Sequence, residues 1–546
     1  MTVEVAGGPC ALDLDLAINS GLIIDGTGNP RYRASIGIKD GKIAGITPSE
    51  IRDAKQVVEA AGLAVCPGFV DIHSHSDFAL LAKSDAQSKI RQGVTTEVVG
   101  NCGVSAAPLE GEAIHDAETS AKQYGLRVTW SSLGEYLSRL ERQGVALNVA
   151  CLVGNGTIRA SVMGFENRAP SDHEMKRMQM LLAQCMREGA FGLSSGLLYP
   201  PSCYAKLDEL SRLAHTAASF GGIYTTHIRD ESDGLEEAVN EALAVGRRAG
   251  VAVQISHHKA CGKRNWGKVR RTLENIAEAR AKGIDAAVDV YPYTAYSTWL
   301  SAAIPPWAYE GGDQRLIERL KDRTVRAKLK RQMRAGLPKW ESMTKGASWD
   351  RFTISSFPQK PSLVGKTIQQ IARLRKCDPF EVVFDLLIEG EATVEVVVED
   401  MSERDVRLVL QSPLSMIGSD GESLSTKGRL GKGRPHPRSF GTFPRVLGRY
   451  VRQSHLLTLE NAIRKMTSLP ANRIGLTDRG VIRKGLAADV VIYDPARVAD
   501  TATYLKPKAF PAGIEYVIVN GITTVARGKF LGRLNGHALR HDAPGL

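Results

Sequence analysis

Long apolar stretches are missing from this sequence. Hydrophobic residues make up 43% of the chain, yet no run of them approaches the roughly 20 residues needed to cross a bilayer. The opening segment, MTVEVAGGPCALDLDLAINS, lacks a basic start followed by an apolar core and a small-residue cleavage site. These absences argue against a membrane protein and a signal peptide, so we expect a cytoplasmic location and no membrane partner.

Cysteine is sparse and irregularly spaced. The 546 residues contain 8 cysteines, without the dense, regular spacing of a disulfide framework, and we therefore expect reduced thiols. Charged residues make up 24% of the chain, so the composition is that of a globular protein rather than a disordered or fibrous one. The length indicates one large domain with a second attached to it, or several ordinary domains.

Positive charge exceeds negative charge, with a formal net charge of +12. The excess is concentrated in RLIERLKDRTVRAKLKRQMRAGLPK, residues 315–339, and a basic stretch raises the question of nucleic-acid binding. Its spacing is typical of a solvated helix, and no motif combining aromatic and basic residues accompanies it. We therefore expect no nucleic-acid partner.

The two ends of the chain share a β-rich texture. Near the start, ASIGIKDGKIAGI carries the hairpin signature Asp40-Gly41, and near the end IEYVIVNGITTVARGKF carries Asn520-Gly521. Because chain termini often lie close together, residues 1–66 and 471–546 are predicted to form one small β domain, a β-sandwich.

Between the two ends, apolar runs alternate with helical signals. Ser171 with Glu174 forms a capping box, and DGLEEAVNEALAVGRRAG ends in the glycine expected after a helix. This alternation indicates parallel β packing. Eight runs favour a TIM-like (β/α)8 barrel of the α/β class over residues 67–470, although periodicity alone leaves a doubly wound open sheet as an alternative. The runs are 63–72, 94–99, 145–153, 191–198, 223–226, 251–255, 284–290 and 415–417.

One interval within this region, residues 299–360, is longer than any ordinary loop. Long intervals of this kind usually carry structure of their own or serve a function. An inserted helical subdomain or lid is predicted there.

Metal-capable side chains follow several of the apolar runs, at what would be the carboxyl ends of the strands, where barrel enzymes place their active sites. His73 and His75 stand two residues apart, so on an extended strand both imidazoles point the same way. Cys102, His227, His257 and Asp420 each follow a further run.

Each of these residues has an ordinary structural explanation when it is taken alone. A single histidine at a strand end often serves only as a hydrogen-bonding residue, Cys102 could be a small buried hydrophobe, and Asp420 followed by Gly421 could be a turn. Recurrence at the same end of successive strands favours a metal site, because every ordinary explanation would otherwise have to hold independently.

The ordered set resembles the amidohydrolase superfamily. Many members bridge two metals with a carboxylated lysine or a glutamate, whereas GVTTEVVGNCG presents Cys102 here and no lysine stands at the expected place. This substitution, and the motifs with it, resemble the D-aminoacylase branch, the N-acyl-D-amino-acid deacylases, over almost the whole chain. The motifs are HSHSD, GLSSGLLYPP, THIRDE, SHHK, DVYPYTAYS, GSDG, HPRSFGTFPRVLG and GVIRKGLAADVVIYDP.

The resemblance implies a ligand set and a substrate. Cys102, His227 and His257 would hold one tight Zn²⁺ with a fourth position left for water, the pattern of a catalytic zinc. His73, His75 and Asp420 would form an adjoining, weaker metal site of open occupancy. The substrate would be a small molecule, an N-acyl-D-amino acid, and its carboxylate would be gripped by cationic and hydroxyl donors. These donors are Lys259, Tyr291, Ser297 and Arg438.

A mechanism follows as a hypothesis. Zinc lowers the pKa of a bound water from 15.7 towards about 7. Asp420, beside the metal, is the candidate for taking the water proton and delivering it to the leaving nitrogen.

The sequence departs from the family pattern in two places. Residues 421–437, GESLSTKGRLGKGRPHP, are longer and more basic than the usual loop. Members that prefer acidic D-amino acids carry an extra arginine beyond the DVYPYTAYS segment, and none follows it here, which favours a neutral or hydrophobic substrate side chain. The roles of residues 315–339 and 421–437, the acyl group and the oligomeric state stay open, and an oligomer is compatible with the sequence.

Three other functions are compatible with parts of the sequence. GLSSG satisfies G-x-S-x-G with Ser194, as in serine hydrolases, but the LLYPP that follows is poor material for the helix which that motif requires. A cyclic amide hydrolase of the dihydroorotase or hydantoinase type would keep the fold and change the substrate. A non-enzymatic scaffold that contacts nucleic acid would leave the ligand set unexplained.

Overall fold

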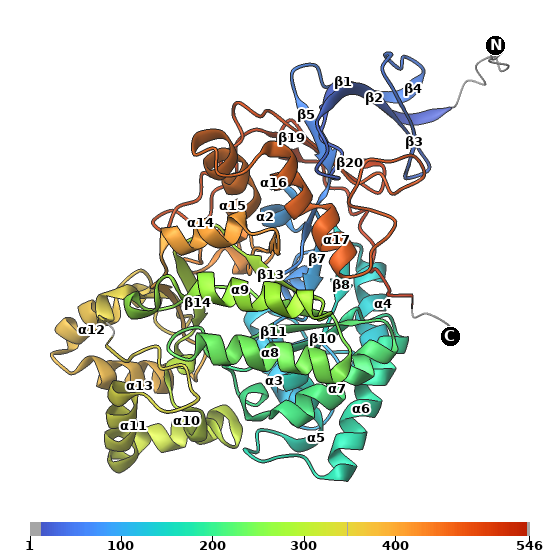
Figure 1. Cartoon of the computed structure of the whole chain (residues 1–546). Coiled ribbons are helices and arrows are strands. Elements are labelled where there is room, and N and C mark those ends of the chain that lie inside the picture. Colours follow the sequence, from blue (N-terminus) through green and yellow to red (C-terminus); the bar gives the residue numbers. More distant parts are fainter. Residues whose placement is uncertain (1–12, 347, 543–546) are drawn as a thin grey trace.

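The computed structural model describes residues 13–346 and 348–542 of the chain. Figure 1 shows a β-sheet built by both ends of the chain at the top, strands surrounded by helices in the middle, and an inserted lobe with α10 to α13 at the lower left.

Both ends of the chain contribute to one nine-stranded sheet. The two halves meet where β5 (Ala64–Pro67) pairs antiparallel with β18 (Val490–Tyr493). The other strands are β1 (Leu14–Ile23), β2 (Tyr32–Lys39), β3 (Lys42–Thr47), β4 (Ala54–Glu59), β19 (Ile514–Val519), β20 (Ile522–Ala526) and β21 (Lys529–Phe530).

Both predicted hairpins are confirmed in this sheet. Asp40 and Gly41 join β2 to β3 with φ values of 48° and 75°, and Asn520 and Gly521 join β19 to β20 with φ values of 48° and 81°. Two-residue hairpin turns of this kind need positive φ at both central positions, which Asn, Asp and Gly tolerate best.

Each of the eight predicted runs in the middle of the chain contains a strand, and these strands pair in parallel. They form a three-stranded sheet, β6-β7-β8, and a six-stranded sheet, β17-β13-β12-β11-β10-β9. The bounds are β6 (Phe69–Asp71), β7 (Val94–Val99), β8 (Asn148–Cys151), β9 (Val153–Gly154), β10 (Gly192–Gly196), β11 (Ile223–His227), β12 (Val253–Ile255), β13 (Ala286–Val290) and β17 (Ser415–Ile417).

The two parallel sheets adjoin each other at both edges. Only Leu152 separates β8 from β9 along the chain. At the other edge, Asp420 N donates to His73 O at 2.8 Å and His75 N donates to Gly421 O at 3.0 Å. The residues that follow β6 and β17 therefore lie side by side, although His75 and Asp420, for example, are 345 positions apart in the sequence.

Helices alternate with these strands, and their predicted ends are confirmed. Ser171 and Glu174 form the capping box of α6, and α8 ends at Gly250 with φ of 65°. Figure 1 shows α7, α8 and α9 lying across the strands on the visible side. The helices of this region are α1 (Ala79–Ala82), α2 (Gln87–Ile90), α3 (Glu112–Tyr124), α4 (Leu133–Gln143), α5 (Asn155–Met163), α6 (Asp172–Arg187), α7 (Leu207–Ser219), α8 (Leu235–Ala249), α9 (Lys268–Ala281), α14 (Glu403–Gln411), α15 (Arg438–Arg445), α16 (Leu459–Met466) and α17 (Ser468–Arg473).

An insertion follows β13 and is longer than the 299–360 interval. It contains a three-stranded sheet in the order β14-β16-β15. Its elements are β14 (Ala295–Trp299), α10 (Gly312–Lys321), α11 (Arg323–Ala335), β15 (Phe352–Ser356), α12 (Ile368–Arg375), α13 (Pro379–Glu389) and β16 (Glu395–Glu399). The pairing of β14 with β16 ties the end of the insertion back to its start.

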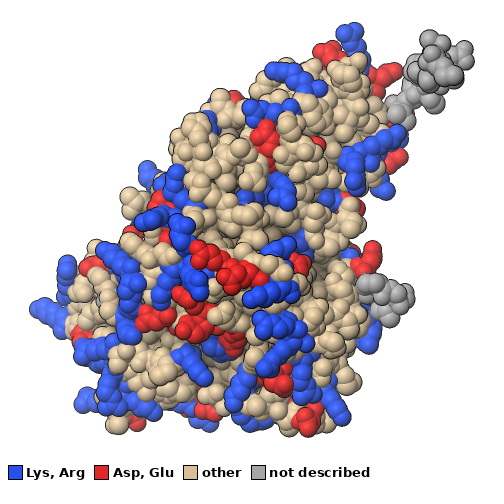
Figure 2. All heavy atoms as spheres, viewed as in Figure 1, with Lys and Arg blue, Asp and Glu red and all other residues tan. Residues whose placement is uncertain are grey.

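The basic segment 315–339 forms two helices instead of one. Asp322 ends α10 and caps α11, because its side chain accepts hydrogen bonds from Thr324 N and Val325 N. Arg326 pairs with Glu381 and Asp385 of α13 at 3.0 and 2.8 Å. Figure 2 shows Lys and Arg side chains interspersed with Asp and Glu across the visible face.

Within residues 13–346 and 348–542, no helix combines the length and the apolar character needed to span a bilayer.

Candidate metal centre

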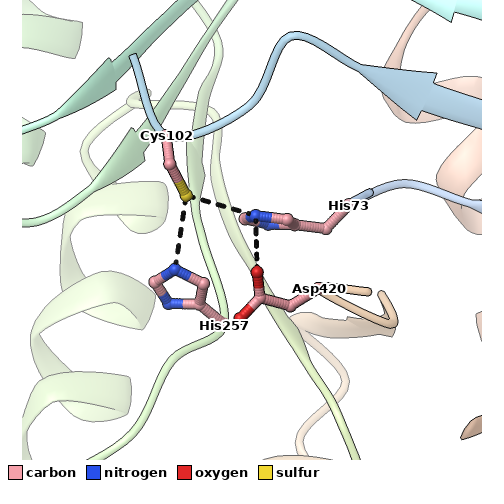
Figure 3. A group of neighbouring side chains, drawn as sticks. All are labelled: His73, Cys102, His257 and Asp420. Atoms are coloured by element: carbon pink, nitrogen blue, oxygen red, sulfur yellow. Dashed lines mark hydrogen bonds and ion pairs between the residues drawn. The ribbon is translucent and has the colours of Figure 1, made fainter. Parts of the chain in front are cut away.

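Four metal-capable side chains converge where the parallel strands end. Cys102 Sγ lies 3.3 Å from His73 Nε2 and 3.5 Å from His257 Nε2. His73 Nε2 lies 3.5 Å from Asp420 Oδ1. Figure 3 shows these side chains pointing toward one another from separate segments. The four residues follow β6, β7, β12 and β17, and all are buried: His73, Cys102, His257 and Asp420.

Three of these residues have left-handed backbone conformations. The φ values are 52° at Cys102, 34° at His257 and 51° at Asp420. Such conformations are uncommon outside glycine and cost of order 1–3 kcal/mol each. They persist here because the surrounding structure holds each residue in a sharp turn at the end of its strand.

Close backbone packing holds the turn at Cys102. A Cβ added to Gly196 would lie 1.9 Å from Cys102 O, so a side chain there would displace this turn. Ser194 Oγ donates to Gly100 O at 2.5 Å and accepts from Gly103 N at 3.1 Å. Ser194 is fully buried inside β10, which contradicts the serine-hydrolase alternative, since that motif places its serine at an exposed turn between a strand and a helix.

His227 lies beside this cluster, in an overlapping group with Glu231 and His257 whose ligand atoms are within 4.8 Å of one another. Its ring centroid lies 4.5 Å from that of His257, and its ring is buried. Among the described residues, neither of its ring nitrogens has a hydrogen-bond partner. A buried polar nitrogen without a partner costs free energy, and a metal ion would satisfy it.

The distances also fit a zinc ion. With Zn–S of about 2.3 Å and Zn–N of about 2.0–2.1 Å, neighbouring ligand atoms of a tetrahedral site lie about 3.5 Å apart. The separations of Cys102 Sγ from His73 and His257, 3.3 and 3.5 Å, match that spacing. The donor set of thiolate and imidazoles is one that zinc prefers.

Two carboxylates that the sequence reasoning missed orient the imidazoles. Glu231 Oε1 lies 3.0 Å from His257 Nδ1, and Asp289 Oδ1 lies 3.2 Å from His73 Nδ1. Asp289 Oδ1 also accepts from His257 N at 2.7 Å. His257 Nδ1 also lies 2.8 Å from Lys259 Nζ. A carboxylate beside one ring nitrogen helps to orient the ring, so that the other nitrogen can bind a metal.

Sequence signals for both carboxylates existed. Glu231 stands four residues after His227 in THIRDE, and Asp289 interrupts the apolar strand Ala286–Val290. A charge within a buried strand requires a partner, so Asp289 could have been identified as part of the site.

Electrostatics at Cys102 favour a thiolate. Burial alone would raise the pKa of the thiol, but the neighbouring imidazoles of His73, His227 and His257 hold it well below its ordinary value. A thiolate is the form in which cysteine binds metals.

Asp420 is ionised and shared among cations. Burial would raise its pKa, yet Arg438 and the histidines hold it well below the ordinary value. Arg438 Nη1 lies 2.6 Å from Asp420 Oδ2, and His75 Nε2 lies 2.9 Å from Asp420 Oδ1. The side chain of His75 is 30% exposed, so it stands on the open side of the cluster.

The predicted substrate donors gather around one ring. The Nζ of Lys259 lies 5.7 Å and the guanidinium carbon of Arg438 5.2 Å from the ring centroid of Tyr291. Arg438 also donates to Ser297 O at 3.3 Å, whereas the Ser297 hydroxyl donates to Val396 O.

Two of these donors are already paired. Lys259 Nζ contacts both carboxylate oxygens of Glu231, at 2.6 and 2.7 Å, and Arg438 is paired with Asp420. A substrate carboxylate would therefore have to share or replace these partners.

Comparison with known proteins extends these findings. A sequence model described as the amidohydrolase family matches residues 56–525. N-acyl-D-glutamate deacylase of Alcaligenes xylosoxydans xylosoxydans is 38% identical over 532 residues, which cover 97% of each chain.

Solved structures of related deacylases are also similar to this chain. N-acyl-D-glutamate deacylase from Bordetella bronchiseptica, complexed with zinc and a phosphonate inhibitor that mimics the tetrahedral intermediate, has a TM-score of 0.82 and 37% identity. A D-aminoacylase studied for its binuclear metal centre has a TM-score of 0.81 and 35% identity. Each alignment covers 97% of this chain and 100% of the other.

Replacing Glu231 with glutamine should weaken zinc binding about 10- to 100-fold, the range found when a partner behind a ligand is lost. The amide is a poorer acceptor for His257 Nδ1 and no longer compensates Lys259. Competition with a chromophoric chelator measures the affinity. Glu237→Gln, at an exposed position in α8, is the matched control, and equal affinities in the two variants would remove Glu231 from this role.

Proposed function

The chain belongs to the amidohydrolase family, and we propose that it is a metal-dependent enzyme that hydrolyses N-acyl-D-amino acids to a carboxylate and a free D-amino acid. The main observation in support of this function is that four metal-capable side chains meet at the carboxyl ends of four parallel strands: His73, Cys102, His257 and Asp420. Relatives named as deacylases of acylated D-amino acids align over nearly the whole chain.

Cys102, His227 and His257 are proposed to hold one tight zinc ion, and His73, His75 and Asp420 an adjoining weaker one. Two observations support the tight site: among the described residues neither ring nitrogen of His227 has a hydrogen-bond partner, and Cys102 Sγ lies 3.5 Å from His257 Nε2. Zinc bound there would supply a nucleophile at neutral pH, because it lowers the pKa of a coordinated water from 15.7 to about 7.

Asp420 is proposed to move the proton. Its carboxylate lies between His73 and His75 on one side and Arg438 on the other. Because its pKa is held low, the carboxylate is ionised at neutral pH, and its place beside the proposed metal ligands His73 and His75 makes it the candidate acceptor of the water proton. The same oxygen then delivers that proton to the leaving nitrogen, which must be protonated before the amide bond breaks.

The carboxylate of the amino acid is proposed to bind among Lys259, Tyr291, Ser297 and Arg438. Lys259 Nζ and the Arg438 guanidinium lie 5.7 and 5.2 Å from the Tyr291 ring centroid, so an anion bound beside this ring would lie near two cations. Arginine suits this task because its guanidinium presents two parallel donors to a carboxylate.

An aromatic wall favours a neutral or hydrophobic side chain on the substrate. Tyr199 packs against His227 with ring centroids 5.1 Å apart, and Trp299 packs against Tyr199 at 5.8 Å. Trp299 is 39% exposed, so the wall runs from the metal centre to solvent. Aromatic surfaces of this kind contribute largely through burial of apolar area.

The architecture is proposed to be a closed (β/α)8 barrel over residues 67–470. The backbone bonds between the segments after β6 and β17 support closure. The terminal sheet would be a separate β-sandwich domain of residues 1–66 and 471–546, of which residues 1–12 and 543–546 lie outside the part that the structure describes. The insertion that follows β13 would serve as a lid. A cytoplasmic location remains part of this proposal.

Cys102→Ala should lose most bound zinc and nearly all activity, because the thiolate is the one soft ligand of the proposed tight site. Zinc content is measured on the same preparation that is assayed with N-acyl D- and L-amino acids and with hydantoins. Cys151→Ala, which removes another buried thiol, should keep both properties. Full zinc and activity in Cys102→Ala would refute the ligand assignment.

Asp420→Asn should lower kcat by about 100-fold or more, the usual contribution of a general base, while most of the zinc is retained. Steady-state kinetics and metal analysis separate the two effects. A kcat near that of the unaltered enzyme would show that another group moves the proton.

Arg438→Met should raise KM far more for an N-acyl-D-amino acid than for the corresponding uncharged carboxamide, since only the former carries the anion. The ratio of the two KM changes isolates carboxylate binding from any disturbance of Asp420. Ser297→Ala, which keeps the carbonyl that Arg438 contacts, should give a smaller ratio. Equal losses on both substrates in Arg438→Met would contradict the clamp.

A further inference from the structure

A buried lysine lies near the metal centre and forms no hydrogen bond or ion pair with any of the proposed ligand side chains. Lys89 of α2 is fully buried, and its Nζ lies 2.7 Å from Asp71 Oδ2 and 2.8 Å from Glu97 Oε1. Both carboxylates are also fully buried, Asp71 at the end of β6 and Glu97 within β7. One ammonium group therefore links α2 to two strands of the small parallel sheet.

The same ammonium also reaches the segment that carries Asp420. Lys89 Nζ donates to Ser419 Oγ at 2.8 Å and to Gly421 O at 3.3 Å. These two residues are the immediate neighbours of Asp420. Lys89 therefore forms hydrogen bonds on both sides of Asp420, whose backbone is left-handed.

Asp71 carries the second half of this contact. Its Oδ1 accepts from Ser419 N at 2.8 Å and its Oδ2 from Ser419 Oγ at 2.5 Å. Asp71 stands two residues before His73, and Asp420 N in turn donates to His73 O. The positions of Asp420 and His73 are therefore set by one shared group of hydrogen bonds.

Glu97 anchors the cluster from the other side. It accepts from Ser76 Oγ and from Ser423 Oγ, both at 2.9 Å. Ser76 follows His75, and Ser423 belongs to the chain after Asp420. The Lys89 ammonium therefore contacts the segments 71–76 and 419–423, either directly or through Glu97. These two segments carry the proposed weaker metal site.

We infer that Lys89 is a positioning residue that sets the orientation of Asp420 and His73 for the proposed reaction. The inference rests on the proposed function for the meaning of that orientation. Removing Lys89 alone would leave the buried carboxylates of Asp71 and Glu97 without their cation, which is strongly destabilising, so kcat has to be compared at equal folded content. The concentration of Lys89 contacts on both neighbours of Asp420 indicates a role in placing the carboxylate.

The chain provides a matched control. Lys465 of α16 is also buried, and its Nζ donates to Ser415 O at 2.8 Å and Ser415 Oγ at 3.0 Å. Ser415 begins β17, the strand whose other end leads to Asp420. Lys465 therefore contacts the first residue of β17, whereas Lys89 contacts the segment that follows β17, near the metal centre. Lys465 has no carboxylate partner among the described residues, and burial lowers the pKa of its amine to about 7.

The test compares Lys89→Met with Lys465→Met as full-length proteins loaded with zinc. Lys89→Met should lower kcat about 10- to 100-fold, as loss of a supporting partner does at metal sites, with little change in KM. Lys465→Met should change kcat by less than about threefold at equal folded content. Equal effects of the two substitutions on kcat would overturn the inference.

A spectroscopic arm is independent of the substrate. Cobalt(II) added to the zinc-free proteins should give visible absorption bands that differ from the unaltered protein in Lys89→Met and match it in Lys465→Met. An unchanged spectrum in Lys89→Met would contradict the inference. Absence of deacylase activity in the unaltered protein, with the spectral difference still present, would reject the proposed function and keep the positioning role.

Ser419→Ala decides the question if Lys89→Met does not fold. This substitution keeps the ion pairs of Lys89 and removes the hydroxyl that is hydrogen-bonded to Lys89, to Asp71 and to the backbone N of Gly421. A fall in kcat and an altered cobalt spectrum support the inference. A normal kcat together with a normal spectrum contradicts it.

Discussion

The closeness of a thiolate, several imidazoles and a carboxylate in a buried space is the constraint on which the rest of the structure depends. Cys102, His73, His257 and Asp420 have ligand atoms within 4.8 Å of one another. Groups of this kind lose their hydration when they are buried and gain little unless they are paired or bound to a metal. The fold must therefore bring these side chains together and also provide partners that replace their lost hydration.

The parallel strands bring the ligand side chains together, and neighbouring charged side chains pair with them. Each ligand follows a different strand, so its position is set by backbone pairing rather than by one flexible loop. Asp289 and Glu231 hold the outer nitrogens of His73 and His257, and Arg438 balances Asp420. The left-handed turns at the strand ends cost free energy, and the close packing around Gly196 and Ser194 keeps the turn at Cys102 in place.

Much of the fold and the proposed ligand set could be predicted from the sequence, because both leave local signals. Apolar runs marked the eight strands, and His73-Ser74-His75 showed the spacing of a metal-binding strand end. The break between α10 and α11 at Asp322 was not predicted, because the capping residue lies within a continuous charged pattern. The full length of the insertion was not predicted either, because β16 pairs with β14 from about 100 residues further along the chain. Lys89 gave no signal, because its partners Asp71, Glu97 and Ser419 come together only through tertiary structure.

X-ray absorption at the zinc edge tests the central claim most directly, because it identifies the atoms around the ion without reference to any substrate. The account predicts one sulfur neighbour at about 2.3 Å together with nitrogen or oxygen neighbours at about 2.0–2.2 Å. Zinc surrounded by nitrogen and oxygen alone, in protein with its full complement of metal, would contradict the role given to Cys102 and with it the proposed site.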